Sequence, residues 1–373
     1  MAAKKADRPK DLRVAIVSDW VQQGGAERIV EQLMLMYPTA PLYTSCISPQ
    51  WQQKFEGRTI VTGYLNWAPF VSIRKFIPML RARWFERLDF RKFDLVISVS
   101  AAEAKGIKVP LYIPHINYCN APTHYYWSRY QDYLKNPGFG ALDPIARIGL
   151  KILLKGRRKW DLQAAKRPQF MIGNSKHIVA EIKKYYGCDA TVIHPPVDIE
   201  RFIKTKPAPR KGFVIAGRQT PYKRIDLAVA AATKLGVPLT VIGNGPEHDK
   251  LVTLAGKTVS FKTQISDDEM SHYFQSASAF LFPGIDDFGI TPVEAMAAGC
   301  PVIAFRGGGA LDYVIPGKTG LFFDDQTVDT LAAAMTKSLN TAWPEAEIAK
   351  KAVEFGPKVF RATMSAFISQ VLD

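Results

Sequence analysis

One stretch of the chain, residues 281–310, constrains the fold and the chemistry more than any other. Its sequence, LFPGIDDFGITPVEAMAAGCPVIAFRGGGA, predicts a buried strand, a loop with two adjacent carboxylates, a short helix, a second buried strand and a glycine-rich turn. In α/β proteins, loops at the carboxyl ends of parallel strands carry glycines where a ligand approaches the backbone, and helix N-termini bind anions there. The stretch therefore predicts a site for a nucleotide phosphate or a sugar nucleotide.

Apolar, β-rich runs alternate with stretches of helical periodicity along the chain, and this alternation predicts mainly parallel sheets. The strands expected in the first half fall within 13–20, 41–46, 94–100, 111–119 and 170–175. Those expected in the second half fall within 212–217, 238–245, 258–263, 279–284 and 301–306, with helices near 224–235, 266–276 and 290–298. At about 150 residues per domain, we expect an α/β protein with two Rossmann-like, parallel-sheet domains that face each other across a cleft.

The boundary between the two domains is expected in the middle of the chain. A Pro-rich stretch at 194–212 indicates a boundary region that begins as early as residue 174. We therefore expect a first, acceptor-side domain over 1–174 and a second domain over 175–355. The last helical segment has no strand after it, and we expect residues 356–373 to pack back on the first domain.

The net charge of +15 and the pI near 9.5 indicate an anionic partner. Nucleic acid, an anionic membrane surface and phosphorylated substrates all have the required charge. Basic and bulky apolar residues are mixed within 74–92 and within 145–159, as in helices that lie in a membrane interface. A domain helix with a solvated basic face gives the same pattern, but two such segments in one half favour the membrane. No nucleic-acid partner is expected, because no helix-turn-helix, RNP or zinc-finger pattern accompanies the charge.

Composition and cysteine usage favour a reducing compartment. The apolar fraction of 47% and the charged fraction of 22% are those of a folded, soluble protein. The first ten residues are polar and basic, and no later run reaches the ~18 apolar residues of a membrane span. Cys46, Cys119, Cys188 and Cys300 lie far apart without a CxxC pair. We expect a cytoplasmic protein associated peripherally with the inner face of the cell membrane.

The segment GRQTPYKRID, residues 217–226, follows an expected buried strand and carries two cations of interest. Arg218 and Lys223 lie five residues apart across a turn that contains proline. Both can therefore contact one anion, the arginine as a planar fork and the lysine as a point charge. A solvated basic turn is the alternative, and the position at the carboxyl end of a strand argues against it.

Carboxylates occupy the corresponding loop of the 281–310 stretch. Asp286 and Asp287 lie beside a glycine where no helix dipole requires them, so they are expected to bind hydroxyl groups. Glu294 is expected in the first turn of a helix that begins near Thr291, where the helix dipole alone would explain a carboxylate.

Two glycine-rich turns precede expected helices and offer backbone amides to an anion. Gly307, Gly308 and Gly309 come just before a helix that starts at Ala310. Gly24 and Gly25 lie between the first strand and the first helix, where a tight turn is the alternative explanation.

No metal ligation and no cofactor are expected. The chain contains no D-x-D, no HExxH and no Cys/His cluster, which are the usual sequence signals of a metal site. Charge on a leaving diphosphate would then be stabilised by Arg218, Lys223 and helix N-termini.

The segments FPGIDDFGITPVEAMAAGCPVIA, GRQTPYKRIDLAV, VIGNGPE, GGAERIVEQL, GNSKHIVAEI and VIHPPVD together resemble the GT-B-fold retaining glycosyltransferases of family 4. The mannosyltransferases that extend lipid-linked glycans and exopolysaccharides are the most similar members. This resemblance spans residues 13–325 and is most specific over 217–320. It implies a GT-B fold and transfer of a hexose from a nucleotide sugar.

The resemblance also implies roles for individual residues. Arg218 and Lys223 would bind the donor diphosphate. Glu294 would bind the ribose, and Asp286 would bind hydroxyls of the transferred sugar. The other positions expected to contact the donor, or in the first turn the acceptor, are Gly24, Gly25, Phe288, Gly289, Ile290, Gly308, Gly309 and Ala310.

Two departures from the family pattern affect the catalytic residues. The family has Glu at both ends of its E-x7-E pattern, whereas here the first position is Asp286, one methylene shorter. In YCNAPTHYYW, Asn120 stands where relatives have a site histidine, and His124 stands where they have arginine. His115 is a further candidate for a donor-sugar contact, although a strand histidine is more often structural.

The sequence therefore predicts a retaining glycosyltransferase that moves mannose from GDP-mannose to a lipid-linked or saccharide acceptor at an anionic membrane surface. A non-hydrolysing sugar-nucleotide epimerase shares the two-domain fold and is one alternative. A degenerate, non-catalytic sugar-nucleotide-binding protein is the other, because Asp286 and Asn120 depart from the family pattern.

Overall fold

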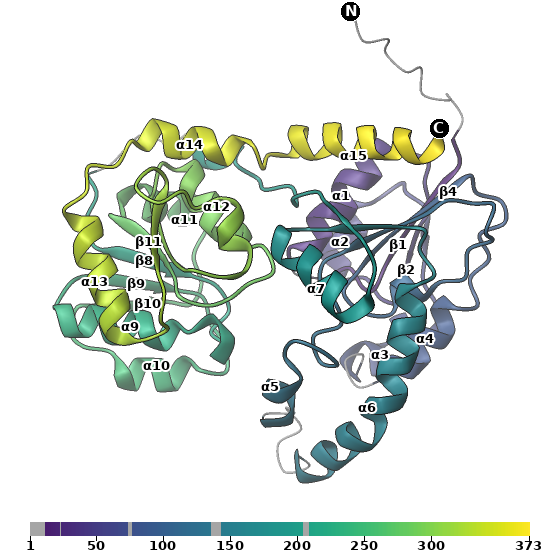
Figure 1. Ribbon diagram of the computed structural model, residues 1–373, viewed down its shortest axis with the longest axis horizontal. Helices are drawn as coiled ribbons and strands as arrows, with labels where there is room; N and C mark the ends of the chain where they lie inside the picture. The colour runs from purple at the N-terminus through teal and green to yellow at the C-terminus, as the bar shows by residue number, and fades with distance from the viewer. Residues whose placement is uncertain (1–11, 23, 74–76, 136–142, 204–208) are drawn as a thin grey trace, which may run out of the picture. The chain divides into compact units, whose positions relative to one another are not determined.

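The computed structural model describes residues 12–22, 24–73, 77–135, 143–203 and 209–373. They form two compact units (Figure 1). Unit 1 contains the described chain up to Pro195 together with Phe360–Asp373, and unit 2 is Pro196–Val359. The division lies after residue 195 rather than after 174, because β7 (Thr191–Val192) pairs with β6 in the first sheet and α7 (Lys176–Tyr186) connects these two strands.

Unit 1 is built on a parallel sheet whose described strands run in the order β3-β2-β1-β4-β5-β6-β7. The strand order reverses between β1 and β4. Loops at the carboxyl ends of strands beside such a reversal are the usual ligand position of a doubly wound sheet. The remaining bounds are β1 (Val14–Ser18), β2 (Leu42–Thr44), β3 (Ile60–Val61), β4 (Leu95–Ser100), β5 (His115–Cys119) and β6 (Phe170–Gly173).

Alternate residues of the unit 1 strands pack against two separate layers, because successive side chains of a strand point to opposite faces. Val14 and Ile16 share a buried cluster with Leu33, whereas Ala15 and Val17 share another with Phe85. The helices of this unit are α1 (Ala26–Met36), α2 (Pro49–Lys54), η1 (Tyr64–Asn66), α3 (Ala68–Ile73), α4 (Pro78–Phe85), η3 (Ala104–Gly106), α5 (Tyr130–Lys135), α6 (Asp143–Ala165) and α7.

Unit 2 repeats this plan with a parallel sheet in the order β10-β9-β8-β11-β12-β13. Here the reversal lies between β8 and β11. The two loops singled out in the sequence, after 216 and after 282, therefore follow neighbouring strands. The strand bounds are β8 (Phe213–Ala216), β9 (Leu239–Ile242), β10 (Val259–Lys262), β11 (Ala279–Phe282), β12 (Val302–Phe305) and β13 (Gly320–Phe323).

Helices also cover both faces of the second sheet. Val214 of β8 packs in one cluster with Met296, and its neighbour Ile215 packs in another with Val229. The helices of unit 2 are α8 (Glu200–Ile203), η5 (Pro221–Lys223), α9 (Ile225–Leu235), α10 (His248–Leu254), α11 (Asp267–Ser276), α12 (Ile290–Ala297), η6 (Gly308–Asp312), α13 (Val328–Leu339) and α14 (Glu345–Val353).

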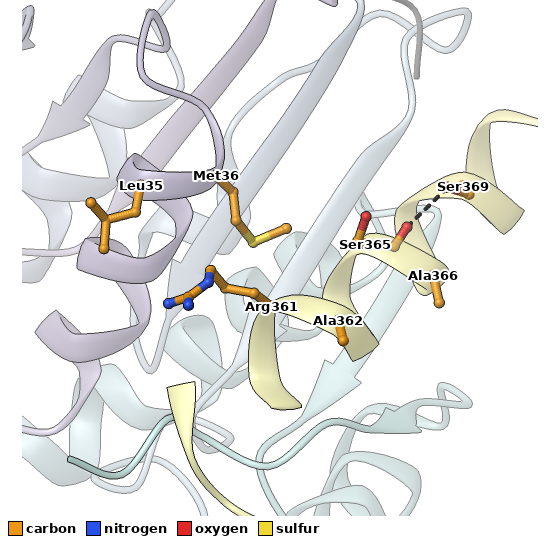
Figure 2. A pocket seen from close by; sticks show the side chains of 7 residues that line it. All are labelled: Leu35, Met36, Arg361, Ala362, Ser365, Ala366 and Ser369. Atoms are coloured by element: carbon orange, nitrogen blue, oxygen red, sulfur yellow. Dashed lines mark hydrogen bonds between the residues drawn. The ribbon is translucent and has the colours of Figure 1, made fainter. Parts of the chain in front are cut away.

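The last helix, α15 (Pro357–Leu372), packs on unit 1 from Phe360 onward. Phe360, Met364 and Ile368 lie four residues apart on one helical face and are buried in the cluster that contains α1. The Arg361 guanidinium donates to the side-chain carbonyl of Gln32. Figure 2 shows Arg361 beside α1, at an open hollow of about 510 Å³ between α1 and α15. The end of the chain therefore belongs to unit 1 structurally.

The expected strands are present, with shifted ends. The fifth strand begins at His115 rather than 111, and Leu111 and Tyr112 are exposed. Strands β3, β7 and β13 were not among the expected strands, because β3 and β7 have two residues each and β13 has four. Among the described residues, no helix combines the length and apolar character needed to cross a membrane.

The first basic, apolar segment is mostly a core helix. Arg81 is buried and its guanidinium lies 2.7 Å from Glu103. Trp84, Phe85 and Phe90 belong to the core under the sheet. Residues 74–76 lie outside the described residues. For 77–92, the structure supports the domain-helix explanation rather than a membrane-facing surface.

Candidate active site

The loops after β8 and β11 meet at the strand-order reversal of unit 2. Gly284 makes this approach possible, because a Cβ atom there would lie 2.6 Å from the carbonyl oxygen of Tyr222 and 2.7 Å from the Cα of Lys223. No side chain fits in that space. The backbone of the β8 loop is thus held against the start of the β11 loop, and Lys223 is placed beside the carboxylates that follow.

Lys223 and Asp286 form an ion pair across these two loops. The short helix η5 ends at Lys223, and Arg224 after it has a left-handed backbone with φ of 51°. The Lys223 ammonium also lies 5.8 Å from the ring centroid of Phe282. The structure thus brings together two residues that the sequence placed 63 positions apart.

Arg218 belongs to the same loop, but its side chain is exposed. Within the described residues it makes no side-chain hydrogen bond or ion pair; only its backbone carbonyl accepts a hydrogen bond, from Thr220. Of the two cations predicted to contact one anion, Lys223 is held in place by its ion pair with Asp286. Arg218 extends into solvent.

Glu294 is buried, and its position differs from the expected one. Helix α12 begins at Ile290, so Glu294 lies in the second turn and not in the first. The helix dipole, which acts within the first turn, does not explain this carboxylate. An Arg201 Nη atom lies 3.5 Å from Glu294, and the other lies 2.8 Å from Asp267. Arg201 was missed because it lies in the Pro-rich stretch that was interpreted as a boundary.

The glycine-rich turn after β12 packs directly on the Asp286 loop. The Gly309 N–H donates to the carbonyl oxygen of Asp286 at 2.9 Å. Gly308 has φ of 63°, a conformation that favours glycine. Ala310 is buried behind them. The three loops after β8, β11 and β12 thus form one continuous edge of unit 2.

Of the remaining predicted contacts in this edge, Phe288 turns its side chain into the core. Its side chain is 3% exposed and packs in the core, with ring centroids 5.5 Å from those of Tyr313 and Phe355. Gly289 caps α12 with φ of 88°, and Ile290 is the first, half-buried residue of the helix. The backbone of residues 289–290 lies at this edge, whereas the Phe288 ring packs in the core.

His115 is not positioned to contact the sugar. It is the first residue of β5, so it lies at the amino end of a parallel strand, opposite the edge where loops carry ligands. Its imidazole is completely buried, with Nε2 2.8 Å from the Ser98 hydroxyl. Burial lowers the pKa of His115 to about 3, so the ring stays neutral. It is a structural residue of the sheet.

Asn120 and His124 lie at the carboxyl edge of the unit 1 sheet. Asn120 follows β5 directly, and its carbonyl accepts a hydrogen bond from the Asn174 side chain at 2.9 Å. The His124 ring lies 2.9 Å from the Ser128 hydroxyl through Nδ1. Gly25 is the N-cap of α1 and Gly24 precedes it, at the end of the loop after β1.

Asp19 holds this edge together, and the sequence analysis missed it. Its buried carboxylate accepts backbone N–H groups of Ala101, Ala102 and Ala104 at 2.6–2.9 Å. It also accepts the Ser100 hydroxyl. The position of Asp19 directly after the first strand could have identified it from the sequence. Its hydrogen-bond partners follow β4, which lies beside β1 at the strand-order reversal.

Both units therefore present a polar edge at the strand-order reversal of their sheet. The edge of unit 2 carries cationic, acidic and glycine groups, which suit a phosphorylated sugar. Among the described residues, no group of three His, Cys, Asp or Glu side chains gathers where it could hold a metal ion.

Each unit matches a family of known proteins. Residues 196–358 match the family "Glycosyl transferases group 1", and residues 23–201 match "Glycosyltransferase Family 4". The fold and these two matches, which together run from 23 to 358, define a glycosyltransferase of the GT-B class. The chain belongs to glycosyltransferase family 4.

Individual relatives are distant. A "GDP-mannose-dependent alpha-(1-6)-phosphatidylinositol monomannoside mannosyltransferase" of Mycolicibacterium smegmatis is 28% identical over 248 residues, which are 53% of this chain and 65% of that protein. The match thus spans just under two thirds of the relative. Among solved structures, HepE of Anabaena in complex with UDP has a TM-score of 0.69 at 17% identity, covering 96% of this chain and 100% of that one. Sucrose-phosphate synthase of Thermosynechococcus elongatus has 0.68 at 18% identity, covering 97% and 99%.

Proposed function

We propose that this protein transfers mannose from GDP-mannose to a lipid-linked or saccharide acceptor, with retention of the α-anomeric configuration. The observation that carries the proposal is the pairing of Lys223 with Asp286 at the strand-order reversal of unit 2. A cation for the diphosphate and a carboxylate for sugar hydroxyls stand side by side there. The mannosyl donor is favoured because the relative from Mycolicibacterium smegmatis is a GDP-mannose-dependent mannosyltransferase.

In this proposal, different residues of unit 2 bind different parts of the donor. Lys223 and the exposed Arg218 bind the diphosphate, with the backbone amides of Gly308, Gly309 and Ala310 around the phosphate oxygens. Asp286 accepts hydrogen bonds from hydroxyls of the transferred sugar. Glu294, held in place by Arg201, accepts those of the ribose.

The reaction proposed needs no covalent intermediate. The acceptor hydroxyl attacks the anomeric carbon on the face from which the diphosphate departs, and the departing charge is stabilised by Lys223, Arg218 and the backbone amides. The proton of the acceptor leaves towards the diphosphate oxygen. Because these groups supply positive charge at the leaving oxygens, we propose that the transfer is independent of a metal ion.

A screen of nucleotide sugars tests the donor. The purified protein is incubated with GDP-mannose, GDP-glucose, UDP-glucose or UDP-galactose, with phosphatidylinositol vesicles or methyl α-mannoside as acceptor. Donors and products are separated by chromatography, which resolves epimers of equal mass, and are then measured by mass spectrometry. We expect GDP-mannose to be consumed fastest, equally with and without EDTA. Preference for a UDP sugar would overturn the mannosyl donor, and interconversion of donors without acceptor would identify an epimerase instead.

We also propose that the protein acts at an anionic membrane surface, on the basis of its net charge of +15. Binding of this kind depends on charge and is weakened by salt. We expect co-sedimentation with phosphatidylglycerol vesicles at low ionic strength and release at high ionic strength. Absence of binding at low salt would contradict the membrane proposal and leave the donor assignment untouched.

A further inference from the structure

The helix α6 has two halves with different surroundings (Figure 1). Its C-terminal half is anchored through Asp161, whose buried carboxylate lies 2.7 Å from the Lys105 ammonium. The same carboxylate accepts hydrogen bonds from Thr123, Trp127 and Tyr186 at 2.7–2.8 Å. Four donors from three other segments therefore fix this end of the helix to the body of unit 1.

The N-terminal half of α6 exposes large apolar side chains. Ile145, Ile148, Ile152 and Leu153 are 69%, 60%, 73% and 54% exposed. The three isoleucines follow the spacing i, i+3, i+7 and so share one helical face. Scattered apolar residues are common on surfaces, but a stripe along one helical face indicates a surface that something covers.

A groove with a basic rim runs beside this stripe. It has a volume of about 530 Å³ and an apolar floor formed by Trp127, Leu154 and Leu162. Five cations line it, and no Asp or Glu is among its described lining residues. The five are Lys151, Lys155, Arg158, Lys159 and Lys166.

Arg158 is built into the wall of this groove. Its Nε donates to the carbonyl of Tyr126 at 2.7 Å, and its guanidinium lies 4.9 Å from the ring centroid of Trp127. None of the four lysines is paired with a carboxylate in the part of the chain that the structure describes. Four unneutralised ammonium groups around an apolar floor match an anionic group attached to an apolar body.

The occupant is better matched by a lipid than by a nucleic acid. Trp127 already stacks on Tyr185, with ring centroids 5.3 Å apart, and the Arg158 guanidinium lies 4.9 Å from its centroid, so a base would have to displace one of these partners in order to stack there. The exposed isoleucine stripe has no counterpart in a nucleic-acid site. Apolar side chains next to lysines are the arrangement of a helix lying in a membrane interface.

We propose that α6 is the lipid-binding element of this protein. Its N-terminal half lies in the membrane interface with Ile145, Ile148 and Ile152 among the acyl chains, and the lysine groove binds the phosphate of an anionic lipid headgroup. The proposal rests on the membrane part of the proposed function and is independent of the donor. It assigns the membrane contact to one helix rather than to the net charge of the whole chain.

Charge reversal in the groove tests the assignment. The groove variant is the double substitution Lys155→Glu with Lys159→Glu. The control is the double substitution Lys257→Glu with Lys318→Glu, which alters two exposed lysines of unit 2. Each Lys→Glu change removes two charge units, so both double variants fall from +15 to +11. Co-sedimentation with vesicles of phosphatidylglycerol and phosphatidylcholine is measured against phosphatidylcholine alone. We expect the groove variant to lose about 30-fold or more in vesicle affinity and the control to lose much less.

Equal losses in the two double variants would overturn the proposal, because bulk charge would then explain the binding. A third variant, Ile148→Ser with Ile152→Ser, keeps the net charge and should bind the vesicles more weakly. If its affinity for the vesicles is unchanged, the apolar stripe does not contact the membrane and the proposed position of α6 is wrong. Release of the wild-type protein by glycerol phosphate at low concentration would assign the groove to a soluble phosphate and also overturn the lipid assignment. Binding of GDP, measured by calorimetry, should be the same in all variants. Failure of the wild type to bind GDP would count against the donor proposal alone.

Discussion

Replacing Lys223 by alanine is expected to lower kcat/KM for the nucleotide-sugar donor by about 100-fold or more. In the structure this ammonium is the fixed cation of the unit 2 edge, whereas Arg218 extends into solvent. A group already in position stabilises charge that develops on the leaving diphosphate without reorganisation. Steady-state rates with saturating acceptor give the effect, and the loss should appear in kcat as well as in KM.

Two variants separate the role of this charge from its contribution to folding. Lys223→Arg keeps the charge, but a planar fork replaces a point charge, so we expect it to retain part of the activity. Lys234→Ala removes another lysine of unit 2 that also pairs with an aspartate, Asp329, but is exposed on α9. It should leave activity unchanged. If Lys223→Ala and Lys234→Ala have the same activity, Lys223 does not bind the leaving group.

It was predictable that Lys223 and Asp286 lie at one edge of the sheet, because both residues stand in loops that follow buried strands. Loops at the carboxyl ends of parallel strands share one edge of a sheet, so any two such loops lie on the same side. Which strands are neighbours was not predictable from periodicity, since order in the sheet depends on long-range packing. Because β8 lies beside β11, the loops after these strands are close enough for Lys223 and Asp286 to form an ion pair.

The remaining differences between sequence analysis and structure have separate physical causes. His115 was a candidate because it lies in the same segment as Asn120 and His124, but it begins the strand and so lies at the opposite end of it. Phe288 was grouped with its loop although its ring is drawn into the core by Tyr313 and Phe355. Arg201 reaches Glu294 across 93 positions, a contact that no local pattern indicates.

The second large effect is expected for Asp286→Asn, in which transfer and nucleotide binding should change in opposite directions. The Asp286 carboxylate pairs with the same ammonium that a diphosphate would use. Two anions therefore compete for Lys223, and the carboxylate repels the incoming phosphate oxygens. An asparagine has almost the same shape and no charge. It should release the lysine and bind GDP about threefold to tenfold more tightly.

Transfer by the same variant should nevertheless fall by about 100-fold, because an amide replaces the charged acceptor for sugar hydroxyls. Calorimetry with GDP and turnover of the donor, measured on one protein preparation, give the two quantities. Glu354→Gln makes the same charge change at an exposed carboxylate of unit 2 that also pairs with a lysine, Lys351, and controls for the general loss of negative charge. Weaker GDP binding in Asp286→Asn would mean that the carboxylate positions Lys223 for the diphosphate instead of competing with it. Equal effects of Asp286→Asn and Glu354→Gln would mean that the Asp286 carboxylate has no specific role. Tighter GDP binding with lost transfer is the outcome that only a carboxylate shared between a resting ion pair and the sugar explains.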